Sequence, residues 1–139
     1  MSSLEVGSET LPVTTGTMPF RGHETWYRVT GTIDPSGSGP APLVVLHGGP
    51  GAAHNYTLAM TSLAADGRAV VHYDQLGCGL STHLPDADPS FWTVDLFVAE
   101  LRALVEHLGI AERFHLLGQS WGGMLGPEVV LSDDSGVAS

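Results

Sequence analysis

Residues 115–130, HLLGQSWGGMLGPEVV, hold the feature on which the architecture of this chain depends. The apolar run 114–119 is typical of a buried β-strand, and the chain from Trp121 onward is typical of a helix. Ser120 lies between the two, so the chain must turn from strand to helix at this residue. A serine on so sharp a turn projects its hydroxyl at the carboxyl end of the strand, beside the free N–H groups that begin the helix.

Glycines flank Ser120 in the pattern G-x-S-x-G at residues 118–122. Only residues without a side chain let the strand and helix backbones pass this closely, which gives Gly118 and Gly122 a steric role. Gly123 is expected to give the helix further room to approach the sheet. The alternative is an ordinary tight turn with an exposed serine. The position between a strand and a helix instead favours Ser120 as a catalytic nucleophile.

A second glycine-rich segment, HGGPG at residues 47–51, follows the apolar strand 43–47. An acyl-transfer site needs N–H donors aimed at the developing oxyanion. In a strand–turn–helix site one donor is the backbone N–H after the nucleophile, here that of Trp121, and another comes from a glycine-rich loop. We expect this second donor to be Gly49, with Gly48 the next candidate. The loop also supplies His47 and Gly48 as candidate substrate-binding residues, and Pro50 and Gly51 as structural ones.

Apolar strands alternate with helical segments along the chain. Two extended segments come first, followed by strands at 43–47, 69–74 and 114–119 that alternate with helices at 55–66, at 93–109 and from Trp121 onward. This order predicts an α/β fold with a mostly parallel sheet, an N-terminal antiparallel hairpin and helices on both faces. Asn55 is the expected N-cap of the first helix, and Gly67 its expected end. Residues 1–10 are polar and expected to be flexible, which leaves 11–139 as one domain.

The composition argues against several classes of partner. Five basic and fifteen acidic residues give a net charge of −10, which disfavours nucleic acid and anionic membranes. No apolar run approaches the roughly 18 residues that a membrane span needs. The single cysteine, Cys78, and an N-terminus unlike a signal peptide indicate a reducing compartment, and we therefore expect a cytoplasmic protein.

Four segments together resemble the proline iminopeptidase (prolyl aminopeptidase) family of α/β-hydrolases. They are LVVLHGGPGAAHNY (43–56), VVHYDQLGCGLSTHLPD (70–86), FWTVDLFVAELRALVEHLGI (91–110) and HLLGQSWGGMLG (115–126). The resemblance implies that Ser120 is the nucleophile and that the N–H groups of Trp121 and Gly49 form the oxyanion hole. It implies no metal and no cofactor, and a small peptide or amino-acid amide substrate that loses its N-terminal residue, preferably proline. It makes the loop 74–81 structural, through Asp74, Gly77 and Gly79.

The chain departs from that family at particular positions. Leu76 and Leu80 stand where family members often carry a basic residue, which bears on the salt bridges of that loop. Pro127 lies inside the helix that follows Ser120, where we expect a kink because proline removes a hydrogen bond and clashes with the preceding turn.

The largest departure is length. The catalytic triad of α/β-hydrolases runs in the order serine, acid, histidine, but no histidine follows Ser120. We therefore expect a partial domain, the N-terminal half of the fold without its cap and C-terminal half, in which the strand 114–119 is an unpaired apolar edge. None of the histidines, His47 included, is expected to be the general base. We expect a serine hydrolase of the prolyl-aminopeptidase type, either as encoded in a complete gene or when completed by a complementing C-terminal chain. The alternatives are a catalytically inactive fragment and an amino-acid amidase or esterase of the same superfamily.

Overall fold

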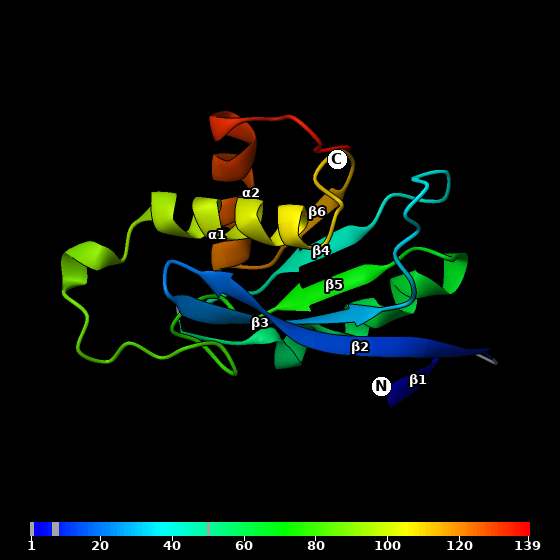
Figure 1. Cartoon of the computed structure of the whole chain (residues 1–139), viewed down its shortest axis with the longest axis horizontal. Helices are drawn as coiled ribbons and strands as arrows, with labels where there is room; N and C mark the ends of the chain where they lie inside the picture. Colours follow the sequence, from blue (N-terminus) through cyan, green and yellow to red (C-terminus); the bar gives the residue numbers. More distant parts are fainter. Residues whose placement is uncertain (1, 7–8, 50) are drawn as a thin grey trace.

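The computed structural model describes residues 2–6, 9–49 and 51–139, in which six strands form one sheet in the order β1-β2-β3-β5-β4-β6 (Figure 1). The strands are β1 (Ser2–Val6), β2 (Glu9–Phe20), β3 (His23–Thr30), β4 (Leu43–Leu46), β5 (Val70–Tyr73) and β6 (His115–Gly118). The helices are the 3₁₀ helices η1 (His54–Asp66) and η2 (Pro89–Phe91) and the α-helices α1 (Val94–His107) and α2 (Trp121–Ser132). None of these helices has both the length and the apolar character that crossing a bilayer requires.

The centre of the sheet is parallel, and its N-terminal part is antiparallel. β4 pairs in parallel with β5 on one side and with β6 on the other, so that Val44 lies opposite both Val71 and Leu116. β2 and β3 form an antiparallel hairpin that joins the centre through β3 and β5. β4 and β5 are buried at every position, as the continuous apolar runs predict. The predicted fold class is confirmed.

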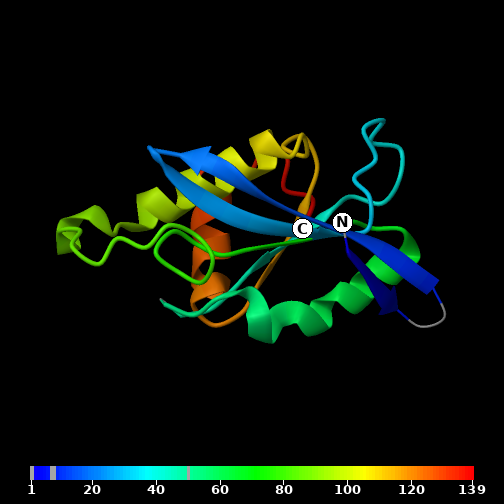
Figure 2. The same ribbon diagram turned by 60° about the horizontal axis from the view of Figure 1, so that its bottom comes forward.

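Helices cover both faces of the sheet. Figure 2 shows η1 on the opposite side of the sheet from α1 and α2. On the face of α1 and α2, the fully buried Leu101 and Leu125 belong to the same core cluster as Val44. On the other face, Ala64 of η1 packs in a smaller cluster with Val45. Alternate residues of one strand therefore supply two separate cores.

The segment 54–66 differs from the expected helix. It is a 3₁₀ helix whose N-cap is Ala53, without a side-chain cap, and not Asn55. The reason lies in a distant contact, because the N–H of His54 is donated to the buried carboxylate of Asp74 at 2.8 Å. Gly67 ends the helix as expected, with a left-handed φ of 92°. α2 runs from Trp121 to Ser132 and includes Pro127.

Part of the N-terminal segment forms a strand, β1, which the sequence did not predict. β2 extends past its last pair with β3, between Val13 and Thr30, and β1 pairs antiparallel with this extension, Leu4 opposite Leu11. The exposed edge of β2 offers backbone donors and acceptors that a polar segment can satisfy as well as an apolar one can. Residues 1, 7 and 8 lie outside the described residues.

The edge formed by β6 is partly paired, which corrects the expectation of an open edge. The end of the chain runs parallel to β6, with an isolated bridge between Phe114 and Val137. Phe114 N–H is donated to the Gly136 carbonyl at 2.8 Å, and Leu116 N–H to the Ser139 carbonyl at 2.9 Å. The tail thus adds the beginning of a further parallel strand next to β6.

Candidate active site

Ser120 occupies a strained turn between β6 and α2, as predicted. Its backbone has φ 58° and ψ −119°, and it is one of two non-glycine residues with positive φ among the described residues, the other being Arg21. Such a conformation costs on the order of 1–3 kcal/mol for a residue with a side chain. Ser120 precedes the first residue of α2 and is exposed. The turn therefore presents its side chain at the carboxyl edge of the parallel sheet, where open α/β sheets bind ligands.

Two of the three neighbouring glycines are required by close backbone contacts. A Cβ at Gly118 would lie 2.1 Å from the carbonyl oxygen of Gly122, and a Cβ at Gly122 would lie 2.0 Å from that of Leu46. Neither contact can relax without moving backbone. Gly123 differs, because its nearest neighbour would be 3.6 Å away, an ordinary contact. The predicted steric role therefore applies to residues 118 and 122 and is not needed at Gly123.

The HGGPG loop lies directly against the Ser120 turn. A Cβ at Gly48 would come within 3.0 Å of Ser120 Cβ and 3.1 Å of the Gln119 carbonyl oxygen. Gly49 and Gly51 have φ of 128° and 95°, which favour glycine. Pro50, expected to stiffen the loop, lies outside the described residues. The two motifs that the sequence singled out are thus in contact.

A buried hydrogen-bond network joins this loop to the turn. His47 is 1% exposed; its Nδ1 donates to the Gly48 carbonyl at 2.7 Å, and its Nε2 accepts from the Gln75 N–H at 3.0 Å. Gln75 Nε2 donates to the His47 carbonyl at 3.0 Å, and Gln75 Oε1 accepts from Trp121 Nε1 at 3.0 Å. Burial lowers the pKa of His47, which favours the neutral ring that this pattern needs. Both ring nitrogens of His47 are therefore engaged in holding the loop in place, and its expected part in substrate binding stays a prediction.

Asp74 holds together the loop that follows β5. Its buried Oδ1 accepts from both the N–H and Nδ1 of His54 at 2.8 Å, and its Oδ2 accepts from the Leu80 N–H at 2.9 Å. A Cβ at Gly79 would lie 2.3 Å from Oδ2, so glycine is needed there. A Cβ at Gly77 would lie 2.6 Å from the ring of Trp92. These contacts account for the structural role expected of all three motif residues.

Three histidines outside the HGGPG loop and the Asp74 contact also make structural contacts. His72 is buried and its Nε2 lies 3.0 Å from the Thr57 carbonyl, while His83 Nε2 lies 2.7 Å from the Gly79 carbonyl. Nδ1 of His115 lies 2.6 Å from the hydroxyl of Ser139. Within the described residues no histidine is hydrogen-bonded to Ser120, and no group of three or more His, Cys, Asp or Glu side chains is placed to hold a metal ion.

Glu100 is a buried carboxyl group that the sequence analysis overlooked. It is 0% exposed on α1, where Thr25 Oγ1 donates to its Oε2 at 2.6 Å and Leu76 N–H donates to the same oxygen at 2.9 Å. Burial raises its pKa to about 7, although the hydrogen bonds from Thr25 and Leu76 act in the opposite direction. Its position on the apolar face of α1, one turn after Leu96, could have identified it from the sequence. Tyr56 was also overlooked; its hydroxyl accepts the Gly48 N–H.

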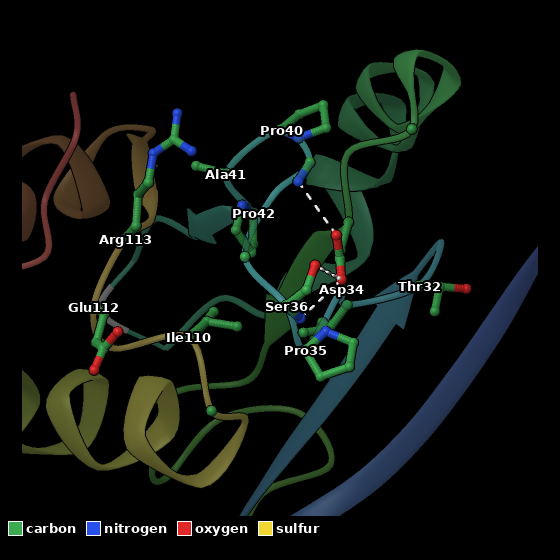
Figure 3. A pocket seen from close by; sticks show the side chains of 16 residues that line it. Thr32, Asp34, Pro35, Ser36, Pro40, Ala41, Pro42, Ile110, Glu112 and Arg113 are labelled. Carbon is green, nitrogen blue, oxygen red and sulfur yellow. Dashed lines mark hydrogen bonds between the residues drawn. The ribbon is translucent and has the colours of Figure 1, made fainter.

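A separate hollow lies at the opposite end of the parallel strands (Figure 3). It is lined by the loop 32–42 that precedes β4 and by residues 109–113 that precede β6. Asp34 in this hollow accepts from Ser36 N–H at 2.9 Å, Ser36 Oγ at 2.6 Å and Gly39 N–H at 3.2 Å, so its carboxylate organises its own loop. The hollow is therefore remote from Ser120 and plays no part in the candidate site.

Known proteins resemble the chain in both sequence and structure. Proline iminopeptidases of Lactobacillus helveticus and Clostridioides difficile are 53% and 46% identical to it over 111 and 114 residues, which cover 79% and 82% of this chain. A crystal structure of proline iminopeptidase from Mycobacterium smegmatis matches 89% of the chain with TM-score 0.80 and 53% identity, and that of VinJ matches 89% with TM-score 0.83 and 55% identity.

The matches cover only part of each relative. The chain spans 36% and 37% of the two curated proteins and 41% of each of the two crystallised chains. Independently of these relatives, a family model described as the alpha/beta hydrolase fold matches residues 41–139, which include the HGGPG loop and the turn at Ser120. The chain therefore belongs to the α/β-hydrolase family, and the two curated proteins and the Mycobacterium smegmatis structure that it resembles are named proline iminopeptidases.

Proposed function

We propose that this chain carries the nucleophile and the oxyanion hole of a serine hydrolase of the prolyl-aminopeptidase type. The observation that supports this most strongly is the contact between the Gly48 backbone and the strained turn at Ser120. The proposed substrate is a short peptide or amino-acid amide with an N-terminal residue, preferably proline. The high identity to proline iminopeptidases favours this substrate class over an amidase or esterase of the same superfamily.

The proposed reaction proceeds in two steps. Ser120 Oγ forms a bond to the carbonyl carbon of the N-terminal residue, the C–N bond breaks, and the hydroxyl proton passes through a general base to the leaving amine. Water then hydrolyses the resulting ester, which releases the N-terminal residue and restores the hydroxyl. Each tetrahedral intermediate carries an oxyanion that needs N–H donors.

The hydrogen bonds around the turn favour two particular donors. Gly122 and Gly123 N–H groups bond back to the carbonyls of Gln119 and Ser120 at 3.0 and 2.8 Å, whereas the Trp121 N–H has no acceptor among the described residues. The first N–H groups of a helix are free in this way. On the loop, the Gly48 N–H is donated to the Tyr56 hydroxyl. This leaves Gly49 as the favoured second donor, with Trp121 as the first.

The described residues place no histidine on Ser120, so the general base must come from elsewhere. We propose that residues 1–139 alone are inactive and that a C-terminal segment, in the same or a complementing chain, supplies the acid and the base. An apolar groove beside β6 and α2, lined by Pro127, Val130 and Leu131 among others, lies where such a segment would pack. Losing the base alone typically costs several orders of magnitude in rate.

The test joins this chain to the part of a relative that the chain does not match. Residues 1–139 would be joined to the unmatched C-terminal portion of the Lactobacillus helveticus enzyme, and hydrolysis of proline 2-naphthylamide would be measured for this fusion and for residues 1–139 alone. We expect turnover from the fusion only, lost in a Ser120→Ala fusion, with the intact relative as the positive control. A folded fusion without Ser120-dependent turnover would overturn the proposed hydrolase. Turnover by residues 1–139 alone would overturn the proposed inactivity.

The proposed compartment is the cytoplasm, on the basis of Cys78. Burial raises the pKa of this thiol, which keeps it protonated and unreactive. A single buried cysteine suits a reducing environment.

A further inference from the structure

We propose that Gln75 is a positioning residue that fixes the separation of the two backbone segments carrying the candidate oxyanion-hole donors. This inference rests on the proposed function for its catalytic consequence, but its geometric part stands independently. Gln75 directly follows β5 and Asp74, and it is 1% exposed. It makes contacts with both the HGGPG loop and the first residue of α2.

The sheet order explains why one side chain can do this. β4 lies between β5 and β6, so the carboxyl end of β4 separates Gln75 from the turn that follows β6. Gln75 bonds to His47, at the end of β4, through its backbone N–H and its Nε2, both at 3.0 Å. Its Oε1 then accepts from Trp121 Nε1 at 3.0 Å. The side chain thus spans the ends of three adjacent strands.

The network requires an amide in particular. Gln75 donates to a carbonyl and accepts from an indole N–H at once, which neither a carboxylate nor a hydrocarbon can do. A carboxylate would set a negative oxygen against the His47 carbonyl, and an apolar side chain would leave both partners without a bond in a buried place. Leaving a buried donor or acceptor unsatisfied costs more than the bond contributes.

The backbone of Gln75 is itself held rigidly. Its carbonyl accepts from the Cys78 N–H at 2.9 Å, and the next N–H, of Leu76, is donated to the buried carboxyl of Glu100 at 2.9 Å. The ring of Trp121 meets Phe97 of α1 edge-on, with centroids 6.0 Å apart. Both ends of the bridge are therefore fixed, and a change at Gln75 has to appear as a shift of Trp121, of the HGGPG loop, or of both.

Two variants separate the two halves of the bridge. Gln75→Met has a similar length and removes both bonds, whereas Gln75→Glu keeps an acceptor for Trp121 Nε1 and removes the donor to the His47 carbonyl. The exposed Gln119, two residues before Trp121 in sequence, provides the control variant Gln119→Met. The first readout is the ¹H–¹⁵N spectrum of the full chain, with the indole cross-peak of Trp121 assigned by Trp121→Phe.

We expect Gln75→Met to shift the Trp121 indole cross-peak and the Gly49 amide. Gln75→Glu should also shift the Gly49 amide, but it should move the indole cross-peak in the direction of a stronger hydrogen bond, because the acceptor becomes a carboxylate. Gln119→Met should leave the indole cross-peak in place. An unchanged indole cross-peak in a folded Gln75→Met chain would overturn the bridge, whatever the activity of the protein.

The second readout is kinetic and uses the fusion described above. Removing one oxyanion-hole donor outright costs about 10²–10³ in kcat, and displacing both donors slightly should cost about tenfold or more in kcat with a smaller change in KM. A Gln75→Met fusion with kcat within about twofold of the unchanged fusion would overturn the positioning role. If the unchanged fusion lacks Ser120-dependent turnover while the spectra change as expected, the proposed function fails and the bridge stands.

Discussion

Replacing Glu100 by glutamine should change how the stability of this protein depends on pH. Burial raises the pKa of Glu100 from its ordinary value of 4.5 to about 7 in the folded chain. Between these values the folded state holds a proton that the unfolded state has released, so the free energy of unfolding falls as the pH rises through this window. The full difference corresponds to about 3 kcal/mol, and about 2 kcal/mol of it falls between pH 5.5 and 8.5.

Other buried groups act in the opposite direction, which makes a comparison of variants necessary. Burial lowers the pKa of His47 and of His72, so both contribute stability that is lost as the pH falls. These contributions are the same in the original chain and in Glu100→Gln, and they cancel in the difference between the two. Starting at pH 5.5 also keeps the protein away from its isoelectric point near 4.8, where association is favoured.

The assay is urea unfolding followed by tryptophan fluorescence at low protein concentration, at several pH values from 5.5 to 8.5. The stability of Glu100→Gln relative to the original chain should rise by about 2 kcal/mol across this range. Stability curves that stay parallel to within about 0.5 kcal/mol would refute the reasoning, because they would mean that the folded chain carries Glu100 ionised with an ordinary pKa.

Two further outcomes follow from backbone contacts and from the exposed groove. Gly122→Ala should lower the free energy of unfolding by more than about 3 kcal/mol, because its Cβ would lie 2.0 Å from the Leu46 carbonyl oxygen. Gly123→Ala should lower it by less than about 1 kcal/mol. Equal losses in thermal unfolding would contradict the steric argument. Leu131 is 80% exposed beside the groove at β6. Leu131→Lys should therefore reduce self-association of the chain, measured by sedimentation velocity, without lowering the melting temperature. A lowered melting temperature would show that Leu131 already packs within the chain.

The sequence predicted those features that depend on neighbouring residues. The turn at Ser120 needs glycine at position 118 because the strand and helix backbones cross there, and this steric demand can be read from five consecutive residues. The same motif also marks Gly122, although its close contact is with the distant Leu46 carbonyl of β4. β4 and β5 were predictable because a strand buried on both faces is apolar throughout. The contact of the HGGPG loop with this turn followed from one topological rule, that parallel strands bring their carboxyl ends to one edge.

The features that the sequence did not predict depend on partners far along the chain. η1 starts at His54 because Asp74 accepts its N–H, and no rule about residues near Asn55 contains that contact. β1 pairs with residues 9–13 of β2, and local sequence patterns do not contain this register between strands. His47 belongs to the motif, but its role depended on Gln75, whose place beside it comes from the order of the strands.

The chemistry of the candidate site has two parts, the stabilisation of negative charge and the transfer of a proton. Ser120, Trp121 and Gly49 would contribute a hydroxyl and two backbone N–H groups, none of which changes its charge near neutral pH. The titratable side chains next to them already make structural hydrogen bonds. His47 is bonded to Gly48 and Gln75, and Asp74 to His54 and Leu80. On the proposed function, the described residues would supply the groups that stabilise negative charge, and the proton transfer would need a base that they do not place on Ser120. A site divided in this way can be fully formed in geometry and still be slow, which is why Gln75 is best tested by spectra as well as by rates.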